Sequence, residues 1–183
     1  VATGQGTNTL AYSYNGNLWI GLGTTIFNNY SNDILYNGVM WLALGKGTLN
    51  TMAYSYNGIN WIGLGATIFS TQGLSVAWNG FMWIAAGSGT NTIAYSFDGI
   101  IWTPATSPFT TDGQNVCWTG VSSGSPTSTA DSKVQRYIAV GAGTNTIAYS
   151  SDAITWTASS PKSVLNFTAG TGGVLSNVLV VTV

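Results

Sequence analysis

Short runs in which larger apolar residues alternate with small or polar ones recur along the chain and predict β-strands. In "TIAYSF", for example, Ile93, Tyr95 and Phe97 fall on one side, and Ala94 and Ser96 fall on the other. A period of two is typical of a strand, because successive side chains point to opposite faces of a sheet. Neither face is clearly polar in these runs, so we expect sheets that are covered on both sides.

The strand pattern belongs to an internal repeat. Four hairpin segments align with one another, and they occupy residues 4–21, 45–63, 87–104 and 141–158. Each carries a serine at the same place, namely Ser13, Ser55, Ser96 and Ser150. Successive serines lie 42, 41 and 54 residues apart, and the last interval is longer because of an enlarged loop at 120–136.

A second pair of strand-like runs stands between the hairpins, as in "ILYNGVMWLALG" from Ile34 and "SVAWNGFMWIAAG" from Ser75. Each repeat therefore contains four strand candidates in about 42 residues, which is typical of a β-propeller blade. Small residues recur where large neighbours recur opposite, as close packing between sheets requires. These small residues are Ala11, Ala53, Ala94 and Ala148.

The two ends of the chain complement each other in this repeat. The start, "VATGQGTNT", aligns with "IAAGSGTNT" and begins within a second strand, whereas the C-terminal "VLSNVLVVTV" supplies a first and a second strand. We expect a single all-β domain over residues 1–183, a β-propeller of four blades closed by joining the N- and C-terminal strands. Because "VAT" and "VVTV" fit the same strand position, two alternatives stay open. The chain closes a larger ring with another copy, or it is a segment of a longer array.

Each hairpin carries a turn-forming pair of residues. Asn15-Gly16, Asn57-Gly58 and Asp98-Gly99 are pairs that tolerate positive φ at both centres of a two-residue type I′ turn. The fourth pair, Asp152-Ala153, has a Cβ at the second centre, where it is strained. We therefore expect a different or looser turn in the fourth hairpin.

The hairpins share the motif Ser-x-Asp/Asn-Gly-x-x-Trp, as in Ser13 to Trp19 and Ser96 to Trp102. This motif resembles the Asp-box of sialidase-like β-propellers, and the line "NTIAYSxDGxxW" resembles repeat arrays of large DNA viruses and of marine viral or microbial sequences. The usual box has one more residue between the acidic residue and the glycine. In that family the box stabilises a hairpin away from the catalytic centre, so the resemblance implies a fold rather than an activity.

Charge is nearly absent from the chain. Only 5% of the residues are charged, and there is no histidine or glutamate. The four Lys and Arg residues are too few and too scattered to neutralise a row of phosphates, so we expect no nucleic-acid partner. The chain has no apolar run of about 18 residues, so we expect no membrane span. Cys117 is the single cysteine, which leaves no disulfide framework and no thiolate metal cluster.

The small number of arginine and acidic residues and the lack of histidine disfavour catalytic chemistry. A sialidase-type glycoside hydrolase would resemble its family in three arginines that hold the substrate carboxylate, and this chain has only Arg136. Without histidine or glutamate there is no histidine triad and no histidine metal site, and the five aspartates are separated along the chain. We expect no enzyme, and hence no catalytic residue, metal or cofactor.

Two functional hypotheses remain. The first is a structural protein of a virion surface or extracellular assembly that packs against protein neighbours or copies of itself, because charges that usually guard sheet edges are missing. Its partner contacts are expected at the enlarged loop, with Asp131, Lys133 and Arg136.

The alternative hypothesis is a propeller that binds neutral carbohydrates through aromatic rings flanked by Asn, Ser and Thr. Three aromatic residues recur just before the turn between the first and second strands of a repeat. They are Tyr36, Trp78 and Trp118.

Overall fold

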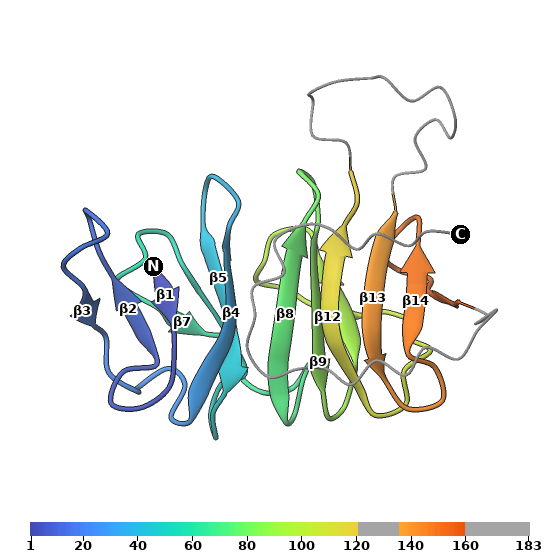
Figure 1. The fold of residues 1–183 in the computed structure, drawn as a ribbon, viewed down its shortest axis with the longest axis horizontal. Coiled ribbons are helices and arrows are strands. Elements are labelled where there is room, and N and C mark those ends of the chain that lie inside the picture. Colours follow the sequence, from blue (N-terminus) through green and yellow to red (C-terminus); the bar gives the residue numbers. More distant parts are fainter. Residues whose placement is uncertain (121–135, 160–183) are drawn as a thin grey trace.

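The computed structural model describes residues 1–120 and 136–159, and within these residues the chain is all-β and contains no helix. The strands stand side by side in a strongly curled arc, shaped like half a barrel (Figure 1). The predicted all-β class is therefore confirmed. The C-terminal segment predicted to close a ring lies outside the described residues.

The strands group into four successive units. Unit 1 contains β1 to β3 and unit 2 contains β4 to β7, each as an antiparallel meander. Their bounds are β1 Ala2–Thr3, β2 Leu10–Tyr12, β3 Ile20–Gly21, β4 Tyr30–Tyr36, β5 Trp41–Lys46, β6 Met52–Ser55 and β7 Ile62–Gly63.

Unit 3 (β8 to β11) and unit 4 (β12 to β15) repeat the four-stranded meander of unit 2. They join into one eight-stranded sheet where Asp112 pairs with Ser88. Their bounds are β8 Gln72–Trp78, β9 Trp83–Ser88, β10 Ile93–Ser96, β11 Thr103–Pro104, β12 Asp112–Trp118, β13 Tyr137–Ala142, β14 Ile147–Ser150 and β15 Thr157–Ala158. Units 2, 3 and 4 thus each contain the four strands that the repeat predicts.

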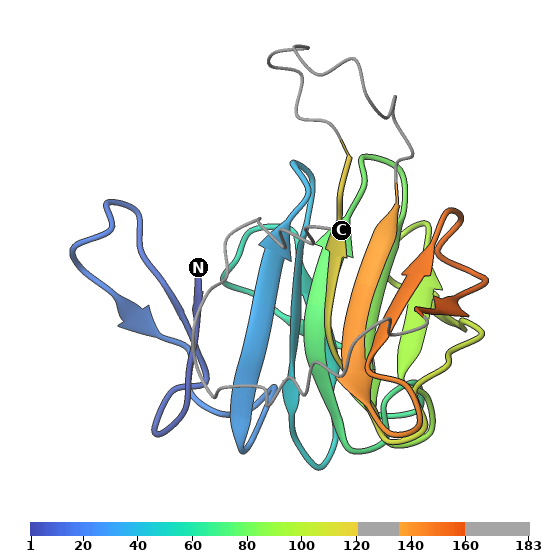
Figure 2. The same cartoon turned by 45° about the vertical axis from the view of Figure 1, so that its right-hand side comes forward.

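The arc formed by the described strands is open. Unit 1 and unit 4 lie at its opposite ends in both views (Figures 1 and 2). Among the described strands, β1 pairs only with β2, whereas β5, β9 and β13 each lie between a first and a third strand. Unit 1 therefore lacks a counterpart of β4, β8 and β12 in this part of the chain.

Hydrophobic clusters fill the spaces between successive units. On β9, Trp83 and Ala85 pack in the cluster shared with unit 2, and Ile84 and Ala86 pack in the cluster shared with unit 4. All four side chains are fully buried. The prediction that a sheet with two apolar faces is covered on both sides is confirmed for unit 3.

A cross-strand alanine pair occurs at the same position in each unit, and in units 2 to 4 it lies on the side that faces the preceding unit. The pairs are Ala2 with Ala11, Ala43 with Ala53, Ala85 with Ala94, and Ala139 with Ala148. The six alanines of units 2 to 4 are at most 1% exposed, and those of unit 1 are half-buried. Larger side chains such as Leu42, Leu44 and Met52 share a cluster with the pair of the following unit. Small residues therefore face large ones, as the repeat predicts.

The predicted two-residue type I′ turns are wrong. β10 ends at Ser96 and β11 begins only at Thr103, and φ is positive at Gly99 but not at Asp98. Side-chain hydrogen bonds hold this longer loop, so the aspartate is needed for its oxygen and not for an unusual backbone conformation.

The expectation of a looser fourth turn is also wrong. Ala153 adopts a φ of 64°, close to the 76° of Gly99. Its N–H donates to Ser150 Oγ at 2.9 Å and its carbonyl accepts from Trp156 Nε1 at 3.0 Å. These bonds and full burial hold Ala153 in a conformation that costs a non-glycine residue about 1–2 kcal/mol.

Gly16 and Gly99 give a matched pair of substitutions, because both have positive φ (77° and 76°). A Cβ at Gly99 would lie 3.0 Å from Trp83 Nε1 and 3.1 Å from Met40 Cε, whereas a Cβ at Gly16 would meet nothing within 4 Å. Both Gly→Ala changes carry the same backbone strain. We expect Gly99→Ala to lower the free energy of unfolding by about 1–3 kcal/mol more than Gly16→Ala, because Met40 and Trp83 must move. Urea unfolding of the two variants measures the difference, and equal losses would contradict it.

Candidate functional site

Within each Ser-x-Asx-Gly-x-x-Trp loop, the Ser, Asx and Trp side chains hydrogen bond to one another or to the loop's own backbone. In unit 3, Ser96 Oγ accepts from Gly99 N at 2.8 Å and donates to Asp98 Oδ1 at 3.0 Å. The same Oδ1 accepts from the backbone N–H of Ile100 and Ile101, each at 2.8 Å. Trp102 Nε1 then donates to Gly99 O at 3.1 Å. The loop thereby satisfies backbone groups that no neighbouring strand reaches.

The same bonds form in the other three units, with Asn15, Asn57 or Asp152 as the acceptor. An amide oxygen therefore replaces a carboxylate oxygen without loss of the loop. Hydrogen bonds from the backbone N–H of Ile101 and of Thr155 hold the pKa of Asp98 and of Asp152 below the ordinary value. The loops therefore favour the ionised form of these two carboxyl groups, which suits their part as hydrogen-bond acceptors.

The three aromatic residues expected at a carbohydrate site each contact an aromatic ring on the second strand of their own unit; Tyr36 is stacked on its partner, and Trp78 and Trp118 are tilted against theirs. Ring centroids lie 4.7 Å apart for Tyr36 and Trp41, and 4.9 Å apart for Trp78 and Trp83. Trp118 lies 4.4 Å from Tyr137. The three pairs belong to adjacent units and occupy the same position in each, at the end of the first strand and the start of the second.

Exposure separates these aromatic residues. Trp78 and Trp118 are half-buried and pack against the clusters between units, whereas Tyr36 is 47% exposed. The Tyr36 hydroxyl donates to Gly38 O at 2.9 Å, which holds the ring against Trp41. The structure therefore gives Trp78 and Trp118 a packing role and leaves one ring, Tyr36, open to solvent.

Tyr137 is a buried tyrosine at the centre of unit 4. Burial and, to a smaller extent, the charge of Asp152 raise its pKa to about 12, against the opposing effect of a hydrogen bond from Asn79 Nδ2. A phenol with this pKa stays protonated at neutral pH. Its hydroxyl serves as a link between unit 3 and unit 4.

A cavity of about 390 Å³ lies beside Arg136, which directly precedes β13. Its guanidinium carbon lies 4.9 Å from the centroid of the Tyr149 ring. The lining residues are Arg136, Tyr149, Ser150, Ser151, Asp152, Thr155 and Thr157. Of the three residues expected to contact a partner, Arg136 lies at this cavity, and Asp131 and Lys133 lie outside the described residues.

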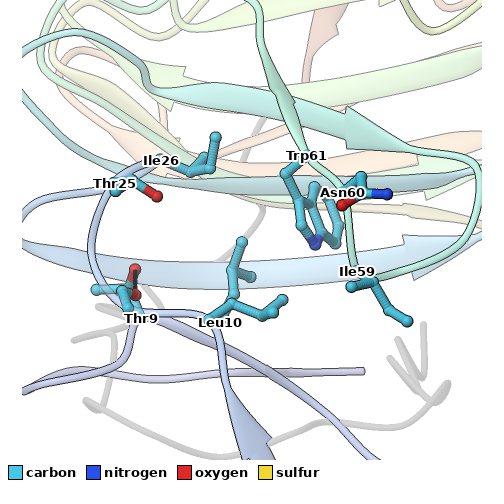
Figure 3. Close-up of a pocket in the computed structure, with 9 residues that line it drawn as sticks. Thr9, Leu10, Thr25, Ile26, Ile59, Asn60 and Trp61 are labelled. Carbon is cyan, nitrogen blue, oxygen red and sulfur yellow. Dashed lines mark hydrogen bonds between the residues drawn. The ribbon is translucent and has the colours of Figure 1, made fainter.

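A second cavity, of about 220 Å³, lies between unit 1 and unit 2, where Leu10 and Trp61 point toward each other (Figure 3). The sequence did not predict it. Between units 3 and 4 the corresponding space is closed, because Thr106 N donates to Ile154 O at 2.9 Å and Thr106 pairs with Thr155. The loops that line the cavity between units 1 and 2 are not joined by an equivalent bond among the described residues.

Asp33 links the first strands of units 2 and 3. Its carboxylate accepts from Ile34 N at 2.8 Å and from Val76 N at 2.9 Å. Burial raises the pKa of Asp33, and these hydrogen bonds partly offset that rise. In unit 3, Ser75 Oγ takes the same part by accepting from Val116 N at 3.4 Å. The Asp33 carboxylate therefore has a structural role, because it links the first strands of units 2 and 3.

Within residues 1–120 and 136–159, no group of three or more His, Cys, Asp or Glu side chains could hold a metal ion. Cys117 is half-buried on β12, and burial raises the pKa of its thiol. The same residues include no helix with the length and apolar character needed to cross a bilayer.

Comparison of the chain with models of known protein families and with curated protein sequences found no match.

The double substitution Asp98→Asn with Asp152→Asn gives these loops the residue type found in units 1 and 2. At neutral pH we expect the free energy of unfolding to change by less than about 1 kcal/mol, because both loops are exposed. The two carboxyl groups have lower pKa values folded than unfolded, so their stabilisation is present above the unfolded value and is lost as pH falls through the folded value.

The variant should therefore lose less stability than the wild type when pH is lowered from about 5 to about 2. Urea unfolding at several pH values measures both curves, and every other titrating group is shared. Parallel curves would show that the loops do not favour the ionised carboxyl.

Proposed function

We propose that this chain is a non-enzymatic structural protein, a β-propeller scaffold that packs against protein neighbours through its repeat interfaces. One observation supports this most directly. The loop tryptophan of unit 1, Trp19, is 46% exposed, whereas its counterpart Trp61 is half-buried and Trp102 and Trp156 are 9% and 5% exposed between units. Unit 1 thus exposes a surface that the other units cover to a greater extent with a neighbouring copy of the repeat.

A closed ring needs a first strand beside β1. By the repeat, residues 174–183 have the sequence of a first and a second strand, so a ring of four blades closed by the chain's own ends is one form of this proposal. Closure by another copy is the other. Both forms use the unpaired edge that β1 has among the described strands.

A virion surface or an extracellular assembly is the proposed location. The low charge supports it, because neutral polar surfaces with few guarding charges suit permanent packing. The resemblance of "NTIAYSFDGIIW" to viral repeat arrays points the same way.

We expect the purified protein to self-associate, or to resist dissociation from its assembly, from micromolar to submillimolar concentration. The reason is the exposed apolar surface of Tyr14, Leu18, Trp19 and Ile20 in unit 1, each at least 43% exposed. Sedimentation velocity over this range measures it. A stable, folded monomer at every concentration, with no protein neighbour in the native particle, would contradict the proposal.

Binding of neutral glycans is a second candidate function, supported by the exposed Tyr36 ring. A flat ring held against Trp41 is suited to stack on the apolar face of a sugar. We expect glycan-array binding to be lost in Tyr36→Ala and kept in Tyr14→Ala, since Tyr14 is 85% exposed but lies in a different loop. Folded protein that binds no glycan would exclude this function.

A further inference from the structure

Every contact between units in the described chain joins the same two kinds of surface. We call the side of a unit that faces the preceding unit its leading face, and the side that faces the next unit its trailing face. The leading face carries the alanine pair and the loop tryptophan, as Ala85, Ala94 and Trp102 do in unit 3. The trailing face carries larger aliphatic residues of the second and third strands, as Ile84 and Ile93 do.

The leading face of unit 1 has the same kinds of residue as the inner leading faces. No other unit within the described residues covers it. Ala2 and Ala11 form its alanine pair and are half-buried, whereas Ala85 and Ala94 are fully buried. Trp19 is 46% exposed.

Two polar residues of unit 1 also differ from their counterparts in units 2 to 4, in burial or in hydrogen bonding. Ser13 is half-buried, while the corresponding serines of units 2 to 4 are at most 2% exposed. In each of units 2 to 4 an asparagine amide donates to a carbonyl of the connection that precedes the unit. These bonds are Asn50 to Ile26, Asn91 to Ile68 and Asn145 to Pro108. Asn8 donates instead to its neighbour Thr7, at 3.4 Å.

The trailing face of unit 4 is the other half of the contact. Its residues Ile138, Val140 and Ile147 are half-buried and Tyr149 is 37% exposed. At the corresponding positions of unit 3, Ile84, Ala86 and Ile93 are fully buried. Its paired strands β13 and β14 carry no charged residue, and Arg136, which directly precedes β13, lies over the Tyr149 ring.

We infer that a second copy of this chain covers both faces, with unit 4 of each copy packed on unit 1 of the other. This inference rests on the proposed scaffold function. The two faces are complementary because the chain joins their equivalents at each of its internal unit contacts. They lie at opposite ends of a half-barrel arc, so a second half-barrel supplies what one copy lacks (Figures 1 and 2).

The closed form follows from symmetry. Each contact joins unlike surfaces, and two such contacts related by a twofold axis close a ring of two copies with no free face. The ring would then contain eight units, and every loop tryptophan would be buried against a neighbouring unit.

Two substitutions test the inference by blocking one face each. Ala11→Arg places a charge on the leading face of unit 1, and Ile147→Arg places one on the trailing face of unit 4. Both residues are half-buried in the single chain, so an arginine can reach solvent there. Leu49→Arg, at a residue that is 75% exposed in a turn, is the matched control.

We expect the wild type and Leu49→Arg to be dimers by sedimentation velocity and native mass spectrometry. Ala11→Arg and Ile147→Arg should each raise the dimer dissociation constant at least about tenfold, because every contact then buries an unpaired charge. An equimolar mixture of the two variants should contain more dimer than either variant alone and less than the wild type. In the mixed pair, one contact joins two unaltered faces and holds the copies together, whereas the other contact brings two arginines together and stays open.

Other outcomes would contradict particular parts of the inference. A wild-type monomer that Ala11→Arg strongly destabilises would mean that the chain covers its own leading face, which overturns the second copy and leaves the scaffold function standing. Open chains of many copies would overturn the closed dimer. A wild-type monomer whose stability and mass neither variant changes would overturn both the inference and the proposed function. Circular dichroism confirms that each variant is folded.

Discussion

The apolar character of both faces of each sheet is the constraint on which the rest of the structure depends. Burial of apolar surface is the main force that stabilises folded chains, and a unit such as unit 3 has no polar face to turn toward water. Its alanines let the larger side chains of the preceding unit approach closely. Its own Ile84 and Ile93 in turn pack in the cluster that contains the alanine pair of the next unit. A single unit cannot satisfy this constraint, so the units form an array.

With so little charge, neutral side chains satisfy the polar groups of the array. The loop serine and Asx residue bind backbone N–H groups, and the turn asparagines Asn50, Asn91 and Asn145 tie each unit to the connection before it, at 3.3, 2.8 and 3.0 Å. A buried donor or acceptor left unpaired costs about 1–3 kcal/mol. The recurrence of Asn, Ser and Thr in the repeats therefore has a structural cause that is independent of any ligand.

Period and alternation were sufficient to predict the strands, the four-strand unit and the covering of both faces. Those features depend on residues such as Ile93 and Ala94 whose direction is set by the pleat. The loops were not predictable in the same way, because side-chain hydrogen bonds to Asp98 decide their shape and a local Asp-Gly pair is equally compatible with a two-residue turn. The three aromatic positions are equivalent in the repeat, so the sequence does not separate them. Trp78 and Trp118 pack against clusters shared with a preceding four-stranded unit, whereas unit 2, which carries Tyr36, is preceded by unit 1, whose described strands include no first strand.

Ala153 shows how strongly the contact between units controls local structure. It holds a left-handed backbone conformation that favours glycine, yet it is fully buried and makes the same bonds as Gly99. The packing around Trp156, which is 5% exposed, thus outweighs a local strain of about 1–2 kcal/mol. In units 2 to 4 this contact buries the alanine pair almost completely. Within residues 1–120 and 136–159, unit 1 and unit 4 each have one half of the contact without its counterpart, so apolar side chains that the inner units bury remain half-buried or exposed there.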